Sequence, residues 1–217
     1  MKTINKIPGA RFGRLLAGAV SLIALCACSG LRPTATVHPA FYALDSAQVN
    51  APLPAKAAAP TLIINPPHAA AGFDSQRIIY VRESHKLEYF ANSEWIDPPA
   101  RMLGPLLVAA IENTGAFRAV VLTPGAATGD LRLDTEIIRL QHEFQSSPSR
   151  VRFTLRAYLV DDKTRRVLAW REFDAAVPAT SEDPYGGVIA ANRAVQSVLK
   201  SLSQFCAETV DNAPLTK

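Results

Sequence analysis

The strongest constraint on the fold is a strict alternation of apolar and polar residues between positions 150 and 159. The apolar set is Val151, Phe153, Leu155, Ala157 and Leu159. The polar set is Arg150, Arg152, Thr154, Arg156 and Tyr158. Because successive side chains of a strand point to opposite faces, this pattern predicts a strand with one buried and one exposed face. The turn-forming run Asp161-Asp162-Lys163-Thr164 follows, so we expect an antiparallel partner strand over residues 166–176.

Further segments predict the rest of the sheet. We expect strands at residues 41–45 and 61–65, a hairpin of 77–82 with 87–91, and strands at 117–122 and 130–144. In the last of these strands the apolar positions change from odd to even numbers near Ile137-Ile138. A change of phase within one strand predicts a β-bulge at that point.

Two amphipathic helices are predicted, each beginning at an aspartate followed by a proline. Asp97-Pro98 and Asp183-Pro184 combine a capping side chain with a residue suited to the first helical position. We expect the first helix to reach about Asn113 and to bend at Pro105, which removes one backbone hydrogen bond. Cys206 falls on the apolar face of the second helix and should be buried. The predicted fold is one α+β domain, a mostly antiparallel or mixed sheet covered on one face by both helices.

The N-terminus has the composition of a bacterial lipoprotein signal. Four basic residues precede the apolar run 15–27, which is too short to span a bilayer as a mature helix. Ala27 is the small residue that cleavage before Cys28 requires. We therefore predict a signal peptide over 1–27, a lipidated tether over 28–40 and a folded domain over 41–210. An ordinary secretory signal with a coincidental cysteine is the alternative. Ser29 rather than aspartate follows Cys28, which favours release to the outer membrane.

Cleavage would also remove the net charge of the chain. The sequence has 23 Lys and Arg against 19 Asp and Glu, and four of the basic residues lie in the signal. The mature chain would carry 19 of each, so its formal charge is zero. The basic isoelectric point is therefore no argument for a nucleic-acid partner.

Motifs of catalysis and of metal or cofactor binding are missing from the sequence. The four histidines lack ligand spacing, and the hydrolase, zinc and nucleotide motifs do not occur. Ser197-Val198-Leu199-Lys200 matches the nucleophile motif of penicillin-recognising enzymes without its companion motifs. Both ends of this motif fall on the polar side of the final helix, where a solvated surface is the simpler interpretation. We expect no enzymatic activity, no metal and no cofactor.

Two groups of side chains are candidates for a protein interface. Arg150, Arg152 and Arg156 form a basic stripe that could bind an acidic patch, although a solvated outer strand face is the simpler interpretation. The second group is aromatic and lies on the predicted hairpin and the following loop. It consists of Tyr80, Tyr89, Phe90 and Trp95. Aromatic residues are frequent interface anchors, and core packing is the alternative for this group.

Taken together, these segments resemble the ABC-type transport auxiliary lipoproteins, the PqiC-like lipoproteins, from about Phe41 to Phe205. The residues that carry the resemblance are Phe41-Tyr42-x-Leu44, Gly72-Phe73-Asp74, Arg77-Ile78-x-Tyr80, Tyr89, Trp95-x-Asp97-Pro98-Pro99, Leu103, Leu107, Gly115, Phe117, the strand from Leu131 to Phe144, Ser149-Arg150-Val151 and Asn192. The sequence departs from the family at its end, where Phe205-Cys206 replaces the usual tryptophan region.

The resemblance implies a periplasmic domain held at the outer membrane through acylated, palmitate-bearing Cys28. Such a protein would serve a lipid transport system built from a permease, an ATPase and an MCE-domain substrate-binding protein. It would act by docking to the MCE-domain protein, and it could form a homo-oligomer. A lipid-carrying module with its own apolar pocket, between sheet and helices, is the alternative. A cell-wall hydrolase acting through Ser197 is a third hypothesis.

Overall fold

The computed structural model describes residues 38–45, 54, 58–125 and 128–212. Cys28, the signal segment and most of the predicted tether lie outside these residues. From Pro39 onward the described residues belong to one compact unit. Its strands are β1 (Ala40–Tyr42), β2 (Thr61–Ile64), β3 (His68–Ala69), β4 (Arg77–Val81), β5 (Glu88–Trp95), β6 (Ala119–Leu122), β7 (Leu131–Glu143), β8 (Arg150–Asp161) and β9 (Val167–Pro178). Its helices are α2 (Pro99–Glu112) and α3 (Pro184–Asn212).

The long strand β7 organises the sheet. One of its edges pairs with β8, which in turn pairs with β9, and both pairings are antiparallel. Along its other edge β2, β3 and β4 follow one another, all parallel to β7. Beyond them, β6 pairs with β2, and β5 connects β4 to β1. The sheet is therefore mixed, with three short parallel strands placed end to end against one long strand.

The predicted bulge in β7 is confirmed. Ile137 lies opposite Leu155 and Arg139 lies opposite Thr154, so Ile138 has no partner in the ladder. This extra residue lets Ile137 and Leu140 both reach the core, although they are an odd number of positions apart.

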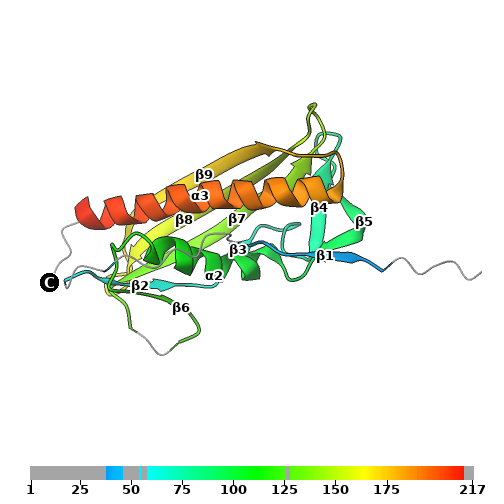
Figure 1. Ribbon diagram of the computed structural model, residues 1–217. Coiled ribbons are helices and arrows are strands. Elements are labelled where there is room, and N and C mark those ends of the chain that lie inside the picture. The colour runs from blue at the N-terminus through cyan, green and yellow to red at the C-terminus, as the bar shows by residue number, and fades with distance from the viewer. Residues whose placement is uncertain (1–37, 46–53, 55–57, 126–127, 213–217) are drawn as a thin grey trace, which may run out of the picture. The chain divides into compact units, whose positions relative to one another are not determined.

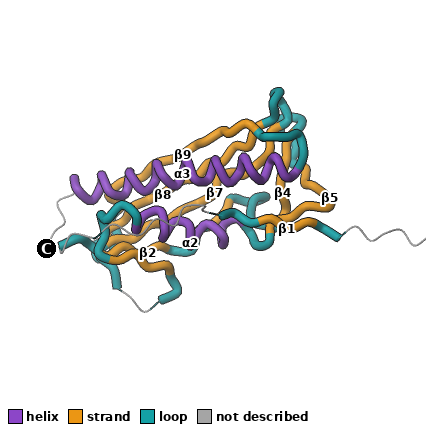
Figure 2. The backbone as a smooth tube through the Cα atoms, in the orientation of Figure 1, coloured by secondary structure: helices purple, strands orange, loops and turns teal. Residues whose placement is uncertain are grey.

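Both helices cover the same face of the sheet, as the ribbon of Figure 1 and the backbone tube of Figure 2 show. All five apolar residues of the alternating set on β8 point to this face and are buried. Leu103, Leu107 and Ile111 of α2 and Leu202 of α3 are also fully buried in the same core. The sequence prediction of an α+β fold with two covering helices is confirmed.

The two helix starts differ, and the prediction for Asp97 is wrong. Pro98 is the N-cap of α2 and Pro99 is its first residue, with no side-chain capping bond. The helical region is disfavoured for a residue that precedes a proline, and Pro98 accordingly has a ψ of 134°. Asp97 therefore lies one residue too early, and its Oδ1 instead lies 3.4 Å from Nη1 of Arg101.

The start of α3 follows the prediction. The backbone N–H of Gly186 donates to Oδ1 of Asp183 at 2.7 Å. This bond, with those from Ser181 and Tyr185, lowers the pKa of the Asp183 carboxyl. The charged cap thus satisfies one of the N–H groups that a helix leaves unpaired at its start.

Candidate functional site

The predicted basic stripe lies on the sheet face opposite the helices, and acidic side chains neutralise it. Nε of Arg150 lies 2.9 Å from Glu143, and Nε of Arg152 lies 3.2 Å from the same carboxylate. Burial alone would raise the pKa of Glu143, but hydrogen bonds from Gln141 and Arg150 and the nearby guanidinium charges lower it. Glu143 is thus ionised and holds two arginines of the stripe.

The remaining arginine contacts extend this pairing across three strands. Arg156 lies between Glu172 of β9, at 3.0 Å, and Glu136 of β7, at 3.6 Å. Arg152 also reaches Asp174 of β9 at 3.2 Å. Each arginine of the stripe therefore has a carboxylate partner within the sheet, which leaves little free positive charge to bind an acidic patch.

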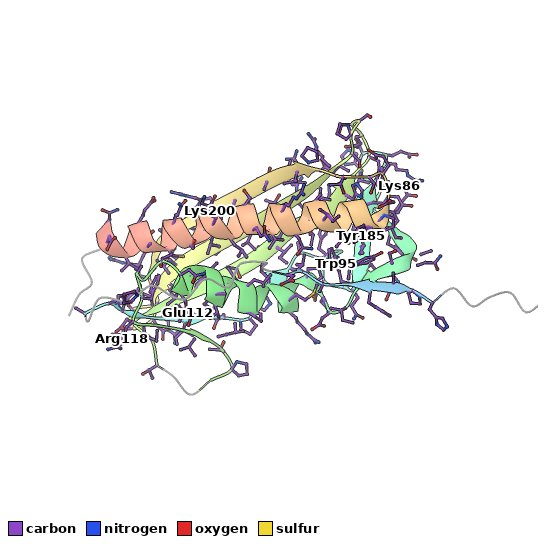
Figure 3. The ribbon with its side chains drawn as sticks, in the orientation of Figure 1. Lys86, Trp95, Glu112, Arg118, Tyr185 and Lys200 are labelled. Carbon is purple, nitrogen blue, oxygen red and sulfur yellow. The ribbon has the colours of Figure 1, made fainter. Side chains whose placement is uncertain are left out.

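The predicted aromatic group divides between the core and the surface. Trp95 is only 3% exposed and packs in the core, so it is a core residue rather than an exposed anchor (Figure 3). Tyr80 and Phe90 are half-buried, with ring centroids 4.6 Å apart. Tyr89 is half exposed, and the guanidinium of Arg77 lies 4.1 Å from its ring centroid.

Tyr80 and Phe90 belong to a cluster that sequence reasoning did not identify. Phe144 packs against both rings, at 5.9 Å from Tyr80 and 6.4 Å from Phe90. The imidazole of His142 packs against Phe144, with centroids 4.1 Å apart and ring planes tilted by 34°. The cluster forms because β4 lies beside the end of β7, a pairing that the sequence does not reveal.

His142 is the centre of a buried polar group at this end of the core. Its Nε2 lies 2.7 Å from Oγ of Ser149, whose backbone N–H donates to Glu182 at 2.9 Å. Burial lowers the pKa of His142, and the charges of Glu182 and Asp183 only partly oppose this shift. Ser149 is fully buried, so this serine–histidine pair is closed to a substrate. The group instead connects the end of β7 to the segment that precedes α3.

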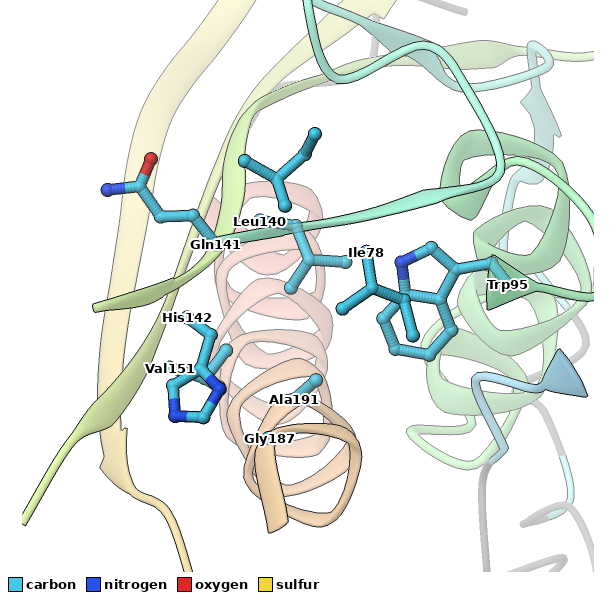
Figure 4. Close-up of a pocket in the computed structure, with 9 residues that line it drawn as sticks. Ile78, Trp95, Leu140, Gln141, His142, Val151, Gly187 and Ala191 are labelled. Atoms are coloured by element: carbon cyan, nitrogen blue, oxygen red, sulfur yellow. The ribbon is translucent and has the colours of Figure 1, made fainter. Parts of the chain in front are cut away.

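A small cavity lies beside His142, between the sheet and α3. Its volume is about 10 Å³, and its walls include Trp95, Leu140, His142, Gly187 and Ala191 (Figure 4). A space of this volume accommodates about one water molecule. The contact between the sheet and the helix is therefore closely packed.

A larger groove lies between the start of β9 and the last turns of α3, with a volume of about 640 Å³. We call it the β9–α3 groove. Its lining residues are Arg166, Val167, Leu168, Ala169, Trp170, Arg171, Phe205, Glu208, Thr209 and Asn212. Trp170 is 62% exposed and stacks on Tyr158 of β8, with ring centroids 6.3 Å apart. The guanidinium of Arg171 covers the Phe205 ring at 4.8 Å.

The groove adjoins an open edge of the sheet. Within the described part of the chain, β9 pairs with β8 alone, so its outer edge has no neighbouring strand. An unpaired edge offers backbone N–H and C=O groups to a further strand. Sequence reasoning missed this surface, although Trp170 could have been placed on the polar face because it lies opposite Tyr158 in the hairpin.

Three further sequence predictions concern reactive groups. Ser197 and Lys200 are both exposed on the outer side of α3, as expected (Figure 3 labels Lys200). Cys206 is buried, and burial raises the pKa of its thiol to about 12, as expected for a core residue. Among the described residues, no group of three or more His, Cys, Asp or Glu could hold a metal ion.

Comparison with known proteins identifies the family. Residues 42–203 match the ABC-type transport auxiliary lipoprotein component family. The chain belongs to this family. The match covers every element from β2 to β9 and most of α3. It therefore includes His142 with the aromatic rings packed around it, and the β9 side of the β9–α3 groove. The family description makes the protein an auxiliary lipoprotein of an ABC-type transport system.

Solved structures show the same fold. Protein XCC0632 from Xanthomonas campestris is 25% identical, with a TM-score of 0.69 over 81% of this chain and 99% of its own. An uncharacterised protein that is 13% identical has a TM-score of 0.61 over 78% of this chain and 99% of its own. No curated protein matches the sequence. No helix in the described residues has both the length and the apolar character needed to cross a bilayer.

Proposed function

We propose that the protein is an accessory lipoprotein of an MCE-type lipid transport system, anchored in the outer membrane and facing the periplasm. In this proposal acylated Cys28 holds the domain at the membrane, and the domain docks to the MCE-domain substrate-binding protein. Family membership supports a role in ABC-type transport, and the signal-like sequence before Cys28 supports the anchor.

The packing of the core is the observation that favours docking over lipid carriage. Binding pockets for small molecules have volumes of about 300–1,000 Å³ and enclose most of the ligand. The cavity between the sheet and α3 has only about 10 Å³. The β9–α3 groove is larger, but it lies at the surface and its walls carry Arg166, Arg171 and Glu208. These charges suit a polypeptide better than an acyl chain.

The β9–α3 groove is our candidate for the docking surface. It combines an open strand edge with two exposed apolar side chains, Val167 and Trp170. A partner segment that adds to a sheet edge gains affinity from backbone hydrogen bonds and specificity from neighbouring side-chain pockets. Trp is also among the residues that most often dominate binding energy.

Site-specific crosslinking tests this proposal in the acylated, membrane-bound protein. A photo-reactive amino acid at Val167 should crosslink to the MCE-domain protein. The matched control places it at Lys200, which is also exposed but lies on the outer side of α3. Equal crosslinking from both positions would contradict the proposed surface. Failure to recover the MCE-domain protein from either position, or by co-purification, would contradict the proposed partner.

Native mass spectrometry addresses the alternative of lipid carriage. The docking proposal predicts that the detergent-purified domain carries no stoichiometric lipid beyond its own acyl chains. A tightly bound phospholipid that survives purification would favour the carrier instead.

A further inference from the structure

Exposed apolar side chains gather where the folded unit begins. Phe41 of β1 is 54% exposed, and Ile96, directly after β5, is 55% exposed. We call these two side chains the β1 patch. Figure 1 shows β1 beside β5. Single exposed apolar residues are common on protein surfaces, whereas a group of them marks an interaction site.

The register of β1 and β5 places both of these side chains on one face. Phe41 pairs with Glu94, and the backbone N–H of Ile96 donates to the carbonyl of Tyr42 at 2.7 Å. Paired residues of parallel strands share a face, and so do residues two apart in one strand. Phe41 and Ile96 therefore lie together on the same side. Tyr185 at the start of α3 is also exposed, at 59%, but it lies on the other side, where its ring contacts that of Tyr42 with centroids 6.3 Å apart. Tyr185 is therefore not part of the patch.

The β1 patch is held firmly to the rest of the fold. Oδ1 of Asn192 accepts a bond of 2.7 Å from the N–H of Asp45, and its Nδ2 donates to the carbonyl of Ala43 at 3.2 Å. Leu44, between these two residues, is buried in the core. The helix α3 thus secures the segment directly after Phe41, so the exposure of this ring belongs to the folded state.

The position of Phe41 in the chain indicates what covers the patch. Only 12 residues lie between it and Cys28, so the two are at most roughly 47 Å apart when the chain is fully extended. An acyl anchor at Cys28 would keep the β1 patch within that distance of the bilayer and would give it a high effective concentration there. Aromatic and aliphatic side chains at a membrane surface bury their apolar parts among the lipid headgroups.

We propose that the β1 patch contacts the bilayer surface and orients the domain on the membrane. This inference rests on the proposed anchor at Cys28. It places β1 and the end of β5 against lipid and leaves the β9–α3 groove, near the C-terminal end of α3, directed away from it. The occupant is a lipid surface rather than a partner protein, because the patch begins where the anchored segment joins the fold.

Fluorescence quenching by brominated lipids tests the contact. The acylated protein is reconstituted in vesicles of phosphatidylethanolamine and phosphatidylglycerol, with or without bromine on the acyl chains. The sequence has two tryptophans, and Trp95 is buried, so Trp170→Phe leaves one shielded background signal. Phe41→Trp then reports on the β1 patch, and Ile96→Trp is an independent second probe. Val167→Trp is the matched control, since Val167 is similarly exposed at 49% but lies on β9.

We expect the brominated vesicles to remove most of the added emission of Phe41→Trp and Ile96→Trp and to leave that of Val167→Trp unchanged. Equal quenching at both ends, or no quenching at either while the protein still floats with the vesicles, would refute the contact. Coverage of the patch by a second copy or a partner protein would also appear as missing quenching. Failure to float would refute the anchor and this inference together. If Phe41→Trp and Ile96→Trp are quenched as expected but Val167 does not crosslink to the MCE-domain protein, only the proposed docking is refuted.

Discussion

Gly187→Ala in α3 combines a gain in helix propensity with a steric clash, and the two effects have opposite signs. Gly187 faces the ring of His142 across the contact between the helix and the sheet (Figure 4). A Cβ on this residue would lie 2.6 Å from Nδ1, 3.1 Å from Cε1 and 3.3 Å from Cγ of His142. The ring has little freedom to move, because Ser149 holds its Nε2 at 2.7 Å and Phe144 packs against it.

The magnitudes decide the sign of the effect. Replacing glycine by alanine inside a helix stabilises it by about 1 kcal/mol. Forcing an extra methyl group into a packed core costs about 1–3 kcal/mol, and contact with a confined ring places this site at about 2 kcal/mol. We therefore expect Gly187→Ala to lower the free energy of unfolding by about 1 kcal/mol. For a protein of this size the melting temperature should fall by about 2–4 °C.

Urea and thermal unfolding, followed by circular dichroism, measure this change. The control repeats Gly187→Ala in a His142→Ala background, where the opposing ring is gone. There the substitution should stabilise the protein by about 1 kcal/mol, so the coupling between the two sites should be about 2 kcal/mol. The argument is refuted if Gly187→Ala stabilises the parent protein and the His142→Ala variant equally, as helix propensity alone requires.

Two further predictions follow from the same end of the fold. Burial lowers the folded-state pKa of His142 below its ordinary value of 6.5, so the unfolded chain binds a proton at a higher pH than the folded protein does. The free energy of unfolding should therefore fall as the pH drops below about 6.5, by up to about 1.4 kcal/mol per pH unit. Urea unfolding between pH 7 and pH 5 should show this slope in the parent protein and not in His142→Gln. An unchanged slope in the variant would mean that another group is responsible. Removing the two predicted caps should have unequal effects, because Asp183 accepts the Gly186 N–H whereas α2 has no side-chain cap. Asp183→Ala should lower the melting temperature by about 2–4 °C and Asp97→Ala should barely change it, and equal losses would contradict the assignment of Pro98 as the cap of α2.

The sequence predicted the site less well than it predicted the fold. Each arginine of the stripe was assigned to the correct face of β8, because alternation within one strand determines the face. Their carboxylate partners come from β7 and β9, and those partners depend on register. Trp95 was grouped with Tyr89 because they lie close in sequence. In the fold, Trp95 is buried and Tyr89 is half exposed, and a register shift in the β4–β5 pairing separates the two.

By itself, the sequence determined the local elements of this protein and their buried faces. The alternation in residues 150–159, the change of phase near Ile138 and the Asp183 cap depend on neighbours within a few residues, so they can be read from the chain. Only the tertiary structure decided which elements meet. The parallel pairings of β2, β3 and β4 along β7 join residues about 60 to 70 positions apart. Those pairings assemble the His142 cluster, while the pairing of β1 with β5 brings Phe41 and Ile96 together. Such contacts form because distant apolar faces gain stability from being buried together, and no local pattern specifies the partner.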